Sequence, residues 1–305
     1  MSKPPQSPFK SGFVALIGPP NAGKSTLLNA LLKFPLSIVS PKPQTTRHKL
    51  VGILNGKGWQ LCLLDTPGWL ERAEDKLQDA LIHATHGAVR QDADIIVLLV
   101  APSPPAPETL AGLGRLAARG KPLILAVNKV DKAGLRKAES VAALYAKELP
   151  VSGTHILSAL KGDGVDALLT AIVKSLPESP AYYGTDQLSD RWERFFAAEI
   201  VREEIFNQYH EEIPHASAVV LEEFRERAGR KDSIRVTVYV ERPPQKAILI
   251  GKNGKAISEL RKASLKAIEA FLGRRAELEI WVKVRKNWRK DPRSIKEFGY
   301  TSRVS

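Results

Sequence analysis

The stretch GPPNAGKS, Gly18–Ser25, decides the fold of the first half of the chain. It fits the pattern G-x-x-x-x-G-K-S and lies between the apolar run "GFVALI" and a helix-length segment that begins at Lys24. Glycines let backbone N–H groups turn toward a β-phosphate, and the following helix adds the positive end of its dipole. The stretch therefore predicts a nucleotide-phosphate site. The residues expected to contact the phosphates are Gly18, Pro19, Pro20, Asn21, Ala22, Gly23, Lys24, Ser25 and Thr26.

Within this stretch two side chains have roles of their own. We expect Lys24 to bridge the β- and γ-phosphate oxygens, and the Ser25 hydroxyl to ligate Mg²⁺. The site is thus predicted to hold a nucleoside triphosphate together with magnesium.

Around this stretch, short apolar runs alternate with helix-length segments as far as residue 176. Runs buried on both faces and separated by helices are typical of a mainly parallel sheet in a three-layer α/β sandwich. The expected strands are "GFVALIG", "LVGIL", "WQLCLLD", "DIIVLLV", "PLILAVN" and "THILSA", and the expected helices are Lys24–Lys33, Lys76–Arg90, Pro107–Arg119, Ala138–Leu149 and Val165–Leu176. One strand should run antiparallel at an edge, because an Asn55–Gly56 turn joins "LVGIL" to "WQLCLLD".

The base specificity is predicted by "NKVD", Asn128–Asp131, which follows the apolar run "PLILAV". The Asp131 carboxylate can accept the N1 and N2 hydrogens of guanine, which adenine does not offer in that arrangement. Lys129 would lie along the base, and Asn128 would tie this loop to the phosphate loop. Further on, backbone N–H groups at Ser158 and Ala159 can meet the guanine O6. Guanine nucleotides are therefore the expected ligands.

Two further segments are expected to sense the γ-phosphate. "DTPG" comprises Asp65, Thr66, Pro67 and Gly68; Asp65 should hold Mg²⁺ through a water, and the Gly68 amide should contact the γ-phosphate. The proline-rich segment Ser40–Lys49 supplies Thr45 and Thr46, one of which would complete the Mg²⁺ shell. We favour Thr46, and Thr45 remains open. The segment should be ordered by GTP and released on hydrolysis.

These stretches, in this order, resemble the GTPase superfamily, and "QTTR" with "DTPG" is similar to its translation-factor-related branch. Many members place a glutamine after the last glycine of D-x-x-G to orient the attacking water. Here that position is Trp69, which favours a packing or partner-contact role and slow intrinsic hydrolysis. Asn21 matches a position that resembles the potassium-coordinating asparagine of cation-activated relatives, so K⁺ assistance is a hypothesis.

The chain has 305 residues, one cysteine, Cys62, and a formal net charge of +13. The apolar runs are too short to span a bilayer, and a single cysteine excludes an intrachain disulfide, which favours a reducing cytosol. The charge is unevenly spread: residues 184–241 hold 8 Lys/Arg and 13 Asp/Glu, whereas residues 242–305 hold 17 and 6. The C-terminal part is therefore the expected face for a polyanion.

A second glycine-lysine loop, "IGKNGKAI", lies in this basic part. It fails the phosphate-loop pattern, because two residues separate its glycines and no Ser or Thr follows Lys255. It fits the G-x-x-G loop that clamps single-stranded nucleic acid through its backbone. Bare glycines let phosphates approach, and Lys252 and Lys255 add charge. The expected RNA contacts in this loop are Ile250, Gly251, Lys252, Asn253, Gly254 and Lys255.

The second half is expected to run helix–strand–strand–helix–loop–helix–strand, which resembles an α+β type II KH domain. Its tail, "KVRKNWRKDPR", interleaves basic residues with an aromatic side chain that can stack on a base. The tail residues expected to contact RNA are Arg285, Lys286, Trp288, Arg289 and Lys290. Trp281 lies within a strand, and we expect it to belong to the core; for Trp288 a core or helix-packing role remains an open alternative.

Taken together, "GPPNAGKS", "QTTRH", "DTPG", "NKVD", "IGKNGKAI" and "KNWRKDPR" resemble the Era family of bacterial-type ribosome-assembly GTPases over nearly the whole chain. That resemblance implies an α/β P-loop GTPase domain at 12–177 after a flexible tail at 1–11, a linker at 178–190 and a type II KH domain at 191–305. It also implies GTP and GDP as ligands, the 3′ region of 16S ribosomal RNA and the 30S subunit as partners, and loose contact with the inner membrane. We expect a cytoplasmic monomer.

Three other classes of protein can be distinguished from this assignment by sequence features or by experiment. A translation or tRNA-modification GTPase would share the first half and lack the second loop with its basic tail. An RNA-binding protein with an inert nucleotide domain would show no GTP turnover, even with RNA present. An ATPase would require the guanine interpretation of "NKVD" to be wrong.

Overall fold

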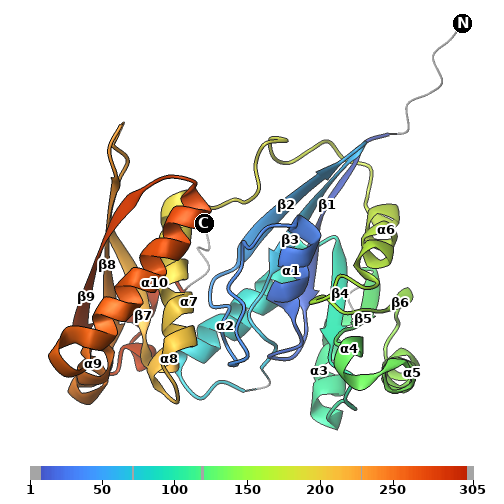
Figure 1. Cartoon of the computed structure of the whole chain (residues 1–305). Helices are drawn as coiled ribbons and strands as arrows, with labels where there is room; N and C mark the ends of the chain where they lie inside the picture. The colour runs from blue at the N-terminus through green and yellow to red at the C-terminus, as the bar shows by residue number, and fades with distance from the viewer. Residues whose placement is uncertain (1–7, 71, 118–119, 228, 301–305) are drawn as a thin grey trace, which may run out of the picture. The chain divides into compact units, whose positions relative to one another are not determined.

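The computed structural model describes residues 8–70, 72–117, 120–227 and 229–300 (Figure 1). The chain forms two compact units that divide between Asp190 and Arg191. Two short segments, Ile38–Thr45 and Glu74–Ala80, group with the second unit.

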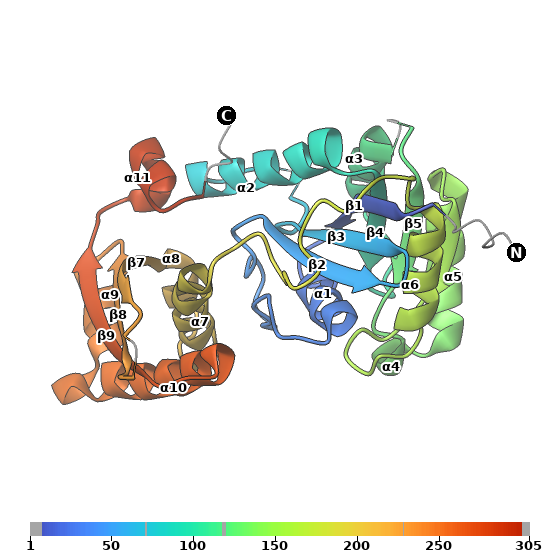
Figure 2. The same ribbon diagram turned by 90° about the horizontal axis from the view of Figure 1, so that it is seen from above.

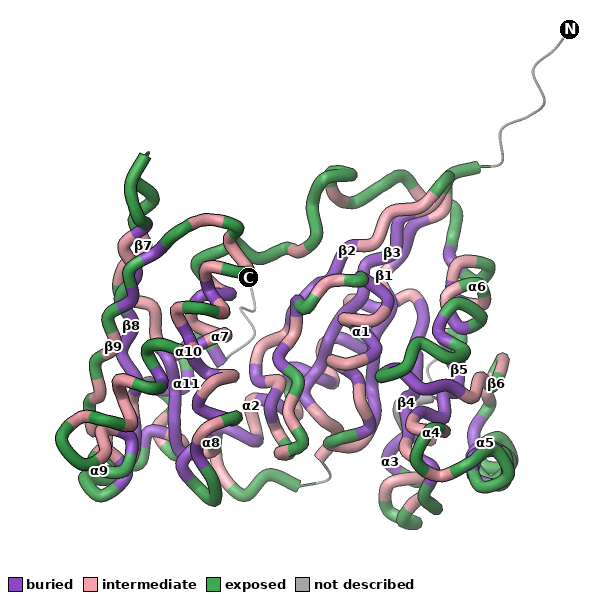
Figure 3. Tube along the Cα trace, in the orientation of Figure 1, coloured by how far each residue is buried: buried purple, intermediate pink, exposed green. Residues whose placement is uncertain are grey.

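The first unit contains a six-stranded sheet in the order β2-β3-β1-β4-β5-β6. β2 is antiparallel to β3 and every other pair is parallel, which confirms the predicted sheet with an antiparallel edge strand. The strands are β1 (Lys10–Ile17), β2 (Leu50–Gly56), β3 (Trp59–Asp65), β4 (Ile95–Val100), β5 (Leu123–Val127) and β6 (Gly153–Ile156). β4 and β5 are buried along their whole length (Figure 3), as expected of central strands covered on both faces.

Helices cover both faces of this sheet, so the three-layer arrangement is also confirmed. α1 and α6 contact each other on one face, and α3 lies on the other (Figure 2). The core of the second face joins residues from η1, α3 and α5 to side chains of the strands. The helices are α1 (Lys24–Leu32), α2 (Lys76–Gly87), the π-helix η1 (Ala88–Asp92), α3 (Pro107–Ala117), α4 (Val130–Ala133), α5 (Leu135–Glu148) and α6 (Val165–Ser175).

The turn between β2 and β3 lies two residues beyond its predicted position. Asn55 and Gly56 pair with Gln60 and Trp59, so the turn is made by Lys57 and Gly58. Gly58 adopts a φ of 80°, a left-handed conformation that glycine adopts without steric cost. The prediction of a turn at Asn55–Gly56 is therefore wrong, although the antiparallel strand pair that it was used to predict is present.

The N-terminal tail is shorter than the predicted 1–11, because Lys10 and Ser11 already belong to β1 and pair with Trp59 and Gln60 of β3. Residues 1–7 of the expected tail lie outside the described residues, as do residues 118–119 at the end of the helix predicted at Pro107–Arg119.

The segment predicted as a linker lies against the first unit. The carbonyl of Leu188 accepts the N–H of Ile53, and the Gln60 side chain accepts the N–H groups of Tyr182 and Tyr183 at 2.8 and 3.0 Å. These bonds hold the linker against the β2–β3 edge of the sheet.

The second unit follows the predicted order of elements and has a three-stranded sheet, β7-β8-β9. β8 is antiparallel to β7 and parallel to β9, and its inward side chains Val236, Val238 and Val240 form the core with those of the surrounding helices. The elements are α7 (Glu193–Gln208), α8 (Ile213–Ala216), β7 (Ala218–Arg225), β8 (Asp232–Val240), α9 (Pro243–Ile250), η2 (Lys252–Gly254), α10 (Lys255–Leu272), β9 (Ala276–Val284), η3 (Trp288–Lys290) and α11 (Pro292–Glu297).

Candidate functional site

The phosphate loop connects β1 to α1 in a conformation that requires its glycines. Gly18 and Gly23 have φ values of 147° and 99°. A Cβ at Gly18 would lie 1.9 Å from the Leu99 carbonyl oxygen, and one at Gly23 would lie 2.3 Å from Nδ2 of Asn128. The loop is thus packed between two strand ends, and larger residues at either glycine would displace it.

Lys24 is buried at the start of α1, and its ammonium donates to the carbonyls of Gly18 and Pro19 at 3.0 Å each. Burial lowers the pKa of Lys24 to about 8, although the nearby Asp65 carboxylate opposes this shift. A desolvated ammonium within the loop is suited to phosphate oxygens, which would replace the two carbonyls as its partners.

Three oxygen-bearing side chains converge beside Lys24. The hydroxyl oxygens of Ser25 and Thr46 are 2.9 Å apart, and Asp65 Oδ2 lies 3.0 Å from the first and 3.5 Å from the second. Asp65 Oδ1 is buried and has no hydrogen-bond partner among the described residues. Burial raises the pKa of Asp65, while hydrogen bonds and Lys24 oppose the shift.

This group of hydroxyl and carboxylate oxygens fits Mg²⁺, which prefers oxygen ligands and retains several waters. The unpartnered Oδ1 of Asp65 is placed to accept a hydrogen bond from such a water. Thr45 does not join the group, because its hydroxyl donates to the Lys42 carbonyl at 2.8 Å. The structure therefore brings Thr46, and not Thr45, to the predicted metal position.

Ser37 is a member of this group that the sequence did not indicate. Its hydroxyl donates to Asp65 Oδ2 at 2.6 Å, and the Asn29 side chain holds the backbone of Ser37 in place. Ser37 lies in an irregular loop after α1, and the sequence carries no motif that would mark it.

The "DTPG" loop lies against the phosphate loop. Thr66 donates to the Leu16 carbonyl at 2.7 Å, and Pro67 accepts a hydrogen bond from Thr85 at 3.2 Å. A Cβ at Gly68 would come within 3.0 Å of the Pro20 backbone, so the two loops touch.

Trp69 occupies the position where many GTPases carry the water-orienting glutamine. Its backbone N–H donates to the Gly18 carbonyl at 2.8 Å, while its ring lies 5.2 Å from that of His86 and against Gly112 of α3. The indole packs on the sheet core. This arrangement agrees with the predicted packing role and supplies no group that could orient a water.

The predicted guanine loop is joined to the phosphate loop through Asn128. Its Nδ2 donates to the Ala22 carbonyl, and its Oδ1 accepts the N–H of Ala159, both at 2.8 Å. Lys129 has a φ of 65° and its ammonium donates to the Asn21 carbonyl at 2.6 Å. One buried amide thus links three loops, of which the phosphate loop lies 106 residues and the Ala159 loop 31 residues from Asn128 in sequence.

Asp131 and Ser158 complete this corner. The Ser158 hydroxyl donates to Asp131 Oδ1 at 2.7 Å, and this bond is the main cause of a lowered pKa of Asp131. The carboxylate is therefore kept ionised and positioned, which is the state that accepts hydrogen bonds from a guanine edge.

The second loop, Gly251–Gly254, joins α9 to α10 in the other unit. Gly251 and Gly254 have φ values of 72° and 74°, and Asn253 has 52°. A Cβ at Gly251 would lie 2.6 Å from that of Ala256, whereas nothing lies within 4 Å of one at Gly254. Lys252, Asn253 and Lys255 are exposed. Open space and bare backbone at the start of an 18-residue helix suit the approach of a phosphate.

Of the two alternatives left open for Trp288, base stacking or a core role, the structure shows the core position. Its side chain is 0% exposed, its Nε1 donates to the Ala216 carbonyl at 2.8 Å, and its ring packs against those of Phe298 and Tyr300. Trp288 is therefore a core residue, and its expected stacking on a base is excluded in this conformation.

Trp281 differs from its prediction in the opposite direction. The sequence suggested a core position, but 52% of its surface is exposed. It lies on the outward face of the edge strand β9. The basic residues of the tail are not equivalent. Lys286 and Lys290 are exposed, whereas Arg285 and Arg289 form ion pairs with Glu297 and Glu241, respectively.

Comparisons with known proteins agree with both halves. The family model described as "50S ribosome-binding GTPase" matches residues 13–129, and the KH domain model matches residues 212–289. GTPase Era of Elusimicrobium minutum is 40% identical over 96% of this chain and 97% of its own length. GTPase Era of Geobacter metallireducens is 40% identical over 97% of this chain and 99% of its own.

Two solved structures are similar over 96% of this chain and 100% of their own. One is a variant of Aquifex aeolicus Era bound to GDP·AlF4⁻, with 34% identity and a TM-score of 0.91. The other is Era in complex with MgGDPNP and nucleotides 1506–1542 of 16S ribosomal RNA, with 35% identity and a TM-score of 0.89. Among the described residues, no helix combines the length and apolar character needed to cross a bilayer.

Proposed function

The chain belongs to the Era family of GTPases, and from this premise we propose that it uses GTP to control its binding of the 3′ region of small-subunit ribosomal RNA. Through this activity it assists maturation of the 30S subunit. The observation that carries the RNA half is the Gly251–Gly254 loop, whose second glycine faces open space at the start of α10. The relative bound to a 16S fragment supports the choice of RNA.

In the nucleotide site, the loop Gly18–Thr26 surrounds the phosphates and donates N–H groups from its non-proline residues, and Lys24 leaves its two carbonyls to bind the β- and γ-oxygens. Ser25 and Thr46 ligate Mg²⁺, and Asp65 holds one of its waters. The metal, when bound, offsets negative charge on the phosphates. Asp131 accepts hydrogen bonds from the guanine edge, while the backbone at Ser158 and Ala159 meets O6.

Hydrolysis transfers the γ-phosphoryl group to water and leaves GDP. Because Trp69 packs against α3 and has no side-chain acceptor, the attacking water must be oriented by another residue, by a cation or by a partner. Intrinsic turnover is accordingly slow. K⁺ beside Asn21 is one such cation; the exposed position and φ of 60° of Asn21 at the loop tip support this role.

On the RNA side, Gly251–Lys255 clamps the sugar-phosphate backbone, and the exposed Lys286 and Lys290 add charge. The aromatic stacking partner is Trp281 in place of the buried Trp288, because only the former presents its ring to solvent. The protein acts as a cytoplasmic monomer. Contact with the inner membrane is peripheral and arises from the same basic residues, which also attract anionic lipid.

The test is fluorescence anisotropy with a labelled oligonucleotide from the 3′ end of small-subunit rRNA. The Lys252→Asp/Asn253→Asp double variant should bind it at least about tenfold more weakly, because it adds negative charge where phosphates approach. GTP affinity should be unchanged in that variant. Wild-type RNA affinity in the variant would refute the role of this loop.

A further inference from the structure

Of the three hydroxyl groups beside Asp65, that of Ser37 is the closest. It lies 2.6 Å from Asp65 Oδ2, compared with 3.0 Å for Ser25 and 3.5 Å for Thr46. Hydrogen bonds of this length from a hydroxyl to a carboxylate are stronger than those between neutral groups. All three hydroxyls contact the same oxygen, and Asp65 Oδ1 is buried without a partner among the described residues. The carboxylate is therefore held through one oxygen, and the other is left for a ligand.

The position of Ser37 is set by Asn29 of α1. Asn29 Oδ1 accepts the backbone N–H groups of Leu36 and Ser37 at 3.0 and 2.8 Å, and its Nδ2 donates to the Ser37 carbonyl at 2.8 Å. One side chain thus holds the backbone on both sides of Ser37. Asn29 lies four positions after Ser25 on α1, so one face of this helix carries both a predicted metal ligand and the residue that places Ser37.

Ser37 differs from the other two hydroxyl donors in having no second task. Ser25 and Thr46 are both expected to ligate Mg²⁺, and Thr46 is expected to do so only with GTP bound. Ser37 precedes the segment Ser40–Lys49 that responds to the γ-phosphate, and it is grouped with the first unit whereas Ile38–Thr45 is grouped with the second. Neither metal ligation nor the response to the γ-phosphate therefore requires Ser37 to leave Asp65.

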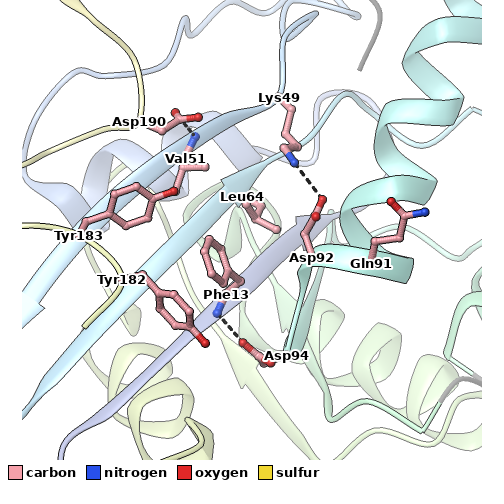
Figure 4. A pocket seen from close by; sticks show the side chains of 10 residues that line it. All are labelled: Phe13, Lys49, Val51, Leu64, Gln91, Asp92, Asp94, Tyr182, Tyr183 and Asp190. Atoms are coloured by element: carbon pink, nitrogen blue, oxygen red, sulfur yellow. Dashed lines mark hydrogen bonds and ion pairs between the residues drawn. The ribbon is translucent and has the colours of Figure 1, made fainter. Parts of the chain in front are cut away.

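Two other aspartates of the first unit are held by different groups. Asp94 accepts the backbone N–H of Phe13 at 2.8 Å, and Asp92 pairs with the Lys49 ammonium at 2.8 Å (Figure 4). A lysine at this distance compensates the charge of the carboxylate that it holds. A hydroxyl orients a carboxylate without adding a positive charge, so the arrangement at Asp65 suits a carboxylate that must act on a cation.

We propose that Ser37 is a positioning residue of the nucleotide site, whose hydroxyl fixes the Asp65 carboxylate so that Oδ1 stays directed to the magnesium position. This inference rests on the proposed function, because it assumes the magnesium-nucleotide site described above. Groups that orient the polar partners of a bound metal typically contribute about tenfold to a hundredfold to metal affinity. Ser37→Ala should therefore weaken Mg²⁺ binding and leave the contacts to the nucleotide itself in place.

The experiment measures the release rate of a fluorescent GDP analogue from the full-length protein over a series of free Mg²⁺ concentrations. The concentration at which Mg²⁺ exerts half of its effect on this rate is the midpoint. Ser37→Ala removes the hydroxyl, and Ser37→Thr retains one. Ser152→Ala is the matched control, because the Ser152 hydroxyl donates to the Leu123 carbonyl at 3.0 Å and Ser152 lies outside the predicted nucleotide site.

We expect the midpoint of Ser37→Ala to be about tenfold higher than that of the wild type, with equal release rates in excess chelator. Ser37→Thr and Ser152→Ala should keep midpoints close to the wild type. A changed rate in chelator with an unchanged midpoint would show a merely structural role. Equal midpoints in the wild type and Ser37→Ala would overturn this inference alone, whereas the absence of any Mg²⁺ effect in the wild type would overturn the proposed function with it.

A double-mutant cycle with Asp65→Asn tests whether Ser37 acts through Asp65. Once the carboxylate is replaced, Ser37→Ala should raise the midpoint little further, so the effects of the two changes should not add. Additive effects would contradict the inference. Ser37→Cys, whose thiol is a weak donor of similar shape, is the second variant should Ser37→Ala fail to fold, and its midpoint should rise in the same direction.

Discussion

The hydroxyl oxygens of Ser25 and Thr46 lie 2.9 Å apart although 21 positions separate the two residues in sequence. Both are within hydrogen-bonding distance of Asp65, whose second carboxylate oxygen is buried without a partner among the described residues. This contact joins the phosphate loop to the segment that is expected to respond to the γ-phosphate.

Thr46→Ala should therefore impair the GTP state selectively. We expect GTP hydrolysis to fall at least tenfold and Mg²⁺-dependent GTP affinity to fall with little change in GDP affinity, because Thr46 is expected to meet the metal only when GTP is bound. Thr45→Ala is the control, since its hydroxyl bonds to Lys42 instead. Equal losses in the two variants, measured by single-turnover hydrolysis, would contradict the assignment of Thr46.

Asp131→Asn should change the base preference of the site. The amide can no longer accept both guanine hydrogens, so GTP affinity should fall at least about a hundredfold while xanthosine nucleotides gain affinity. Competition with a fluorescent GDP analogue gives both values. Asp166→Asn, at the start of α6, provides a charge-matched control. If the variant kept its GTP affinity, the assignment of Asp131 to guanine binding would be contradicted, and an ATPase would be the alternative.

Nucleotide affinity should decline as the pH rises above about 8. Burial lowers the pKa of Lys24 to about 8, so the free protein loses this positive charge above that pH, whereas bound phosphate favours the charged form. Binding above pH 8 must then take up a proton, and affinity falls with each further pH unit. The measurement is GDP affinity from pH 7 to 9.5.

The Lys24→Met variant is the control for this profile, because the guanine base also titrates near the upper end of the range. It should bind weakly at all values and lack the decline attributed to Lys24. The same slope in both proteins would show that the decline comes from another group.

Trp281 and Trp288 of the second unit should respond in opposite ways. Trp288→Ala removes a fully buried indole with a hydrogen bond and should lower the free energy of unfolding by about 3–5 kcal/mol. Trp281→Ala should leave the melting temperature nearly unchanged and weaken RNA binding by about 1–3 kcal/mol. Thermal unfolding and anisotropy separate these effects. Unchanged RNA affinity in the second variant would remove Trp281 from the RNA surface.

The sequence was sufficient for the fold class and for the assembly of the nucleotide site, because both rest on local motifs. A loop between a strand and a helix must place Gly18–Ser25 at a strand end, and parallel strands bring "DTPG" and "NKVD" to the same edge. The links through Asn128 follow from that placement.

Other features depend on contacts that no local pattern records. Ser37 reaches Asp65 from an irregular loop. Strand alternation alone did not reveal which face of β9 is uncovered, so Trp281 was assigned to the core. Trp288 is buried because Phe298 and Tyr300 fold back onto it from further along the chain.

The most direct test is the affinity of wild-type protein for the 3′-end rRNA oligonucleotide, measured with a non-hydrolysable GTP analogue and again with GDP. The complex of a relative with MgGDPNP and 16S rRNA supports tighter binding in the GTP state, by about fivefold or more. That result would establish that one chain couples the two sites. Equal affinities with the two nucleotides would contradict control of RNA binding by GTP.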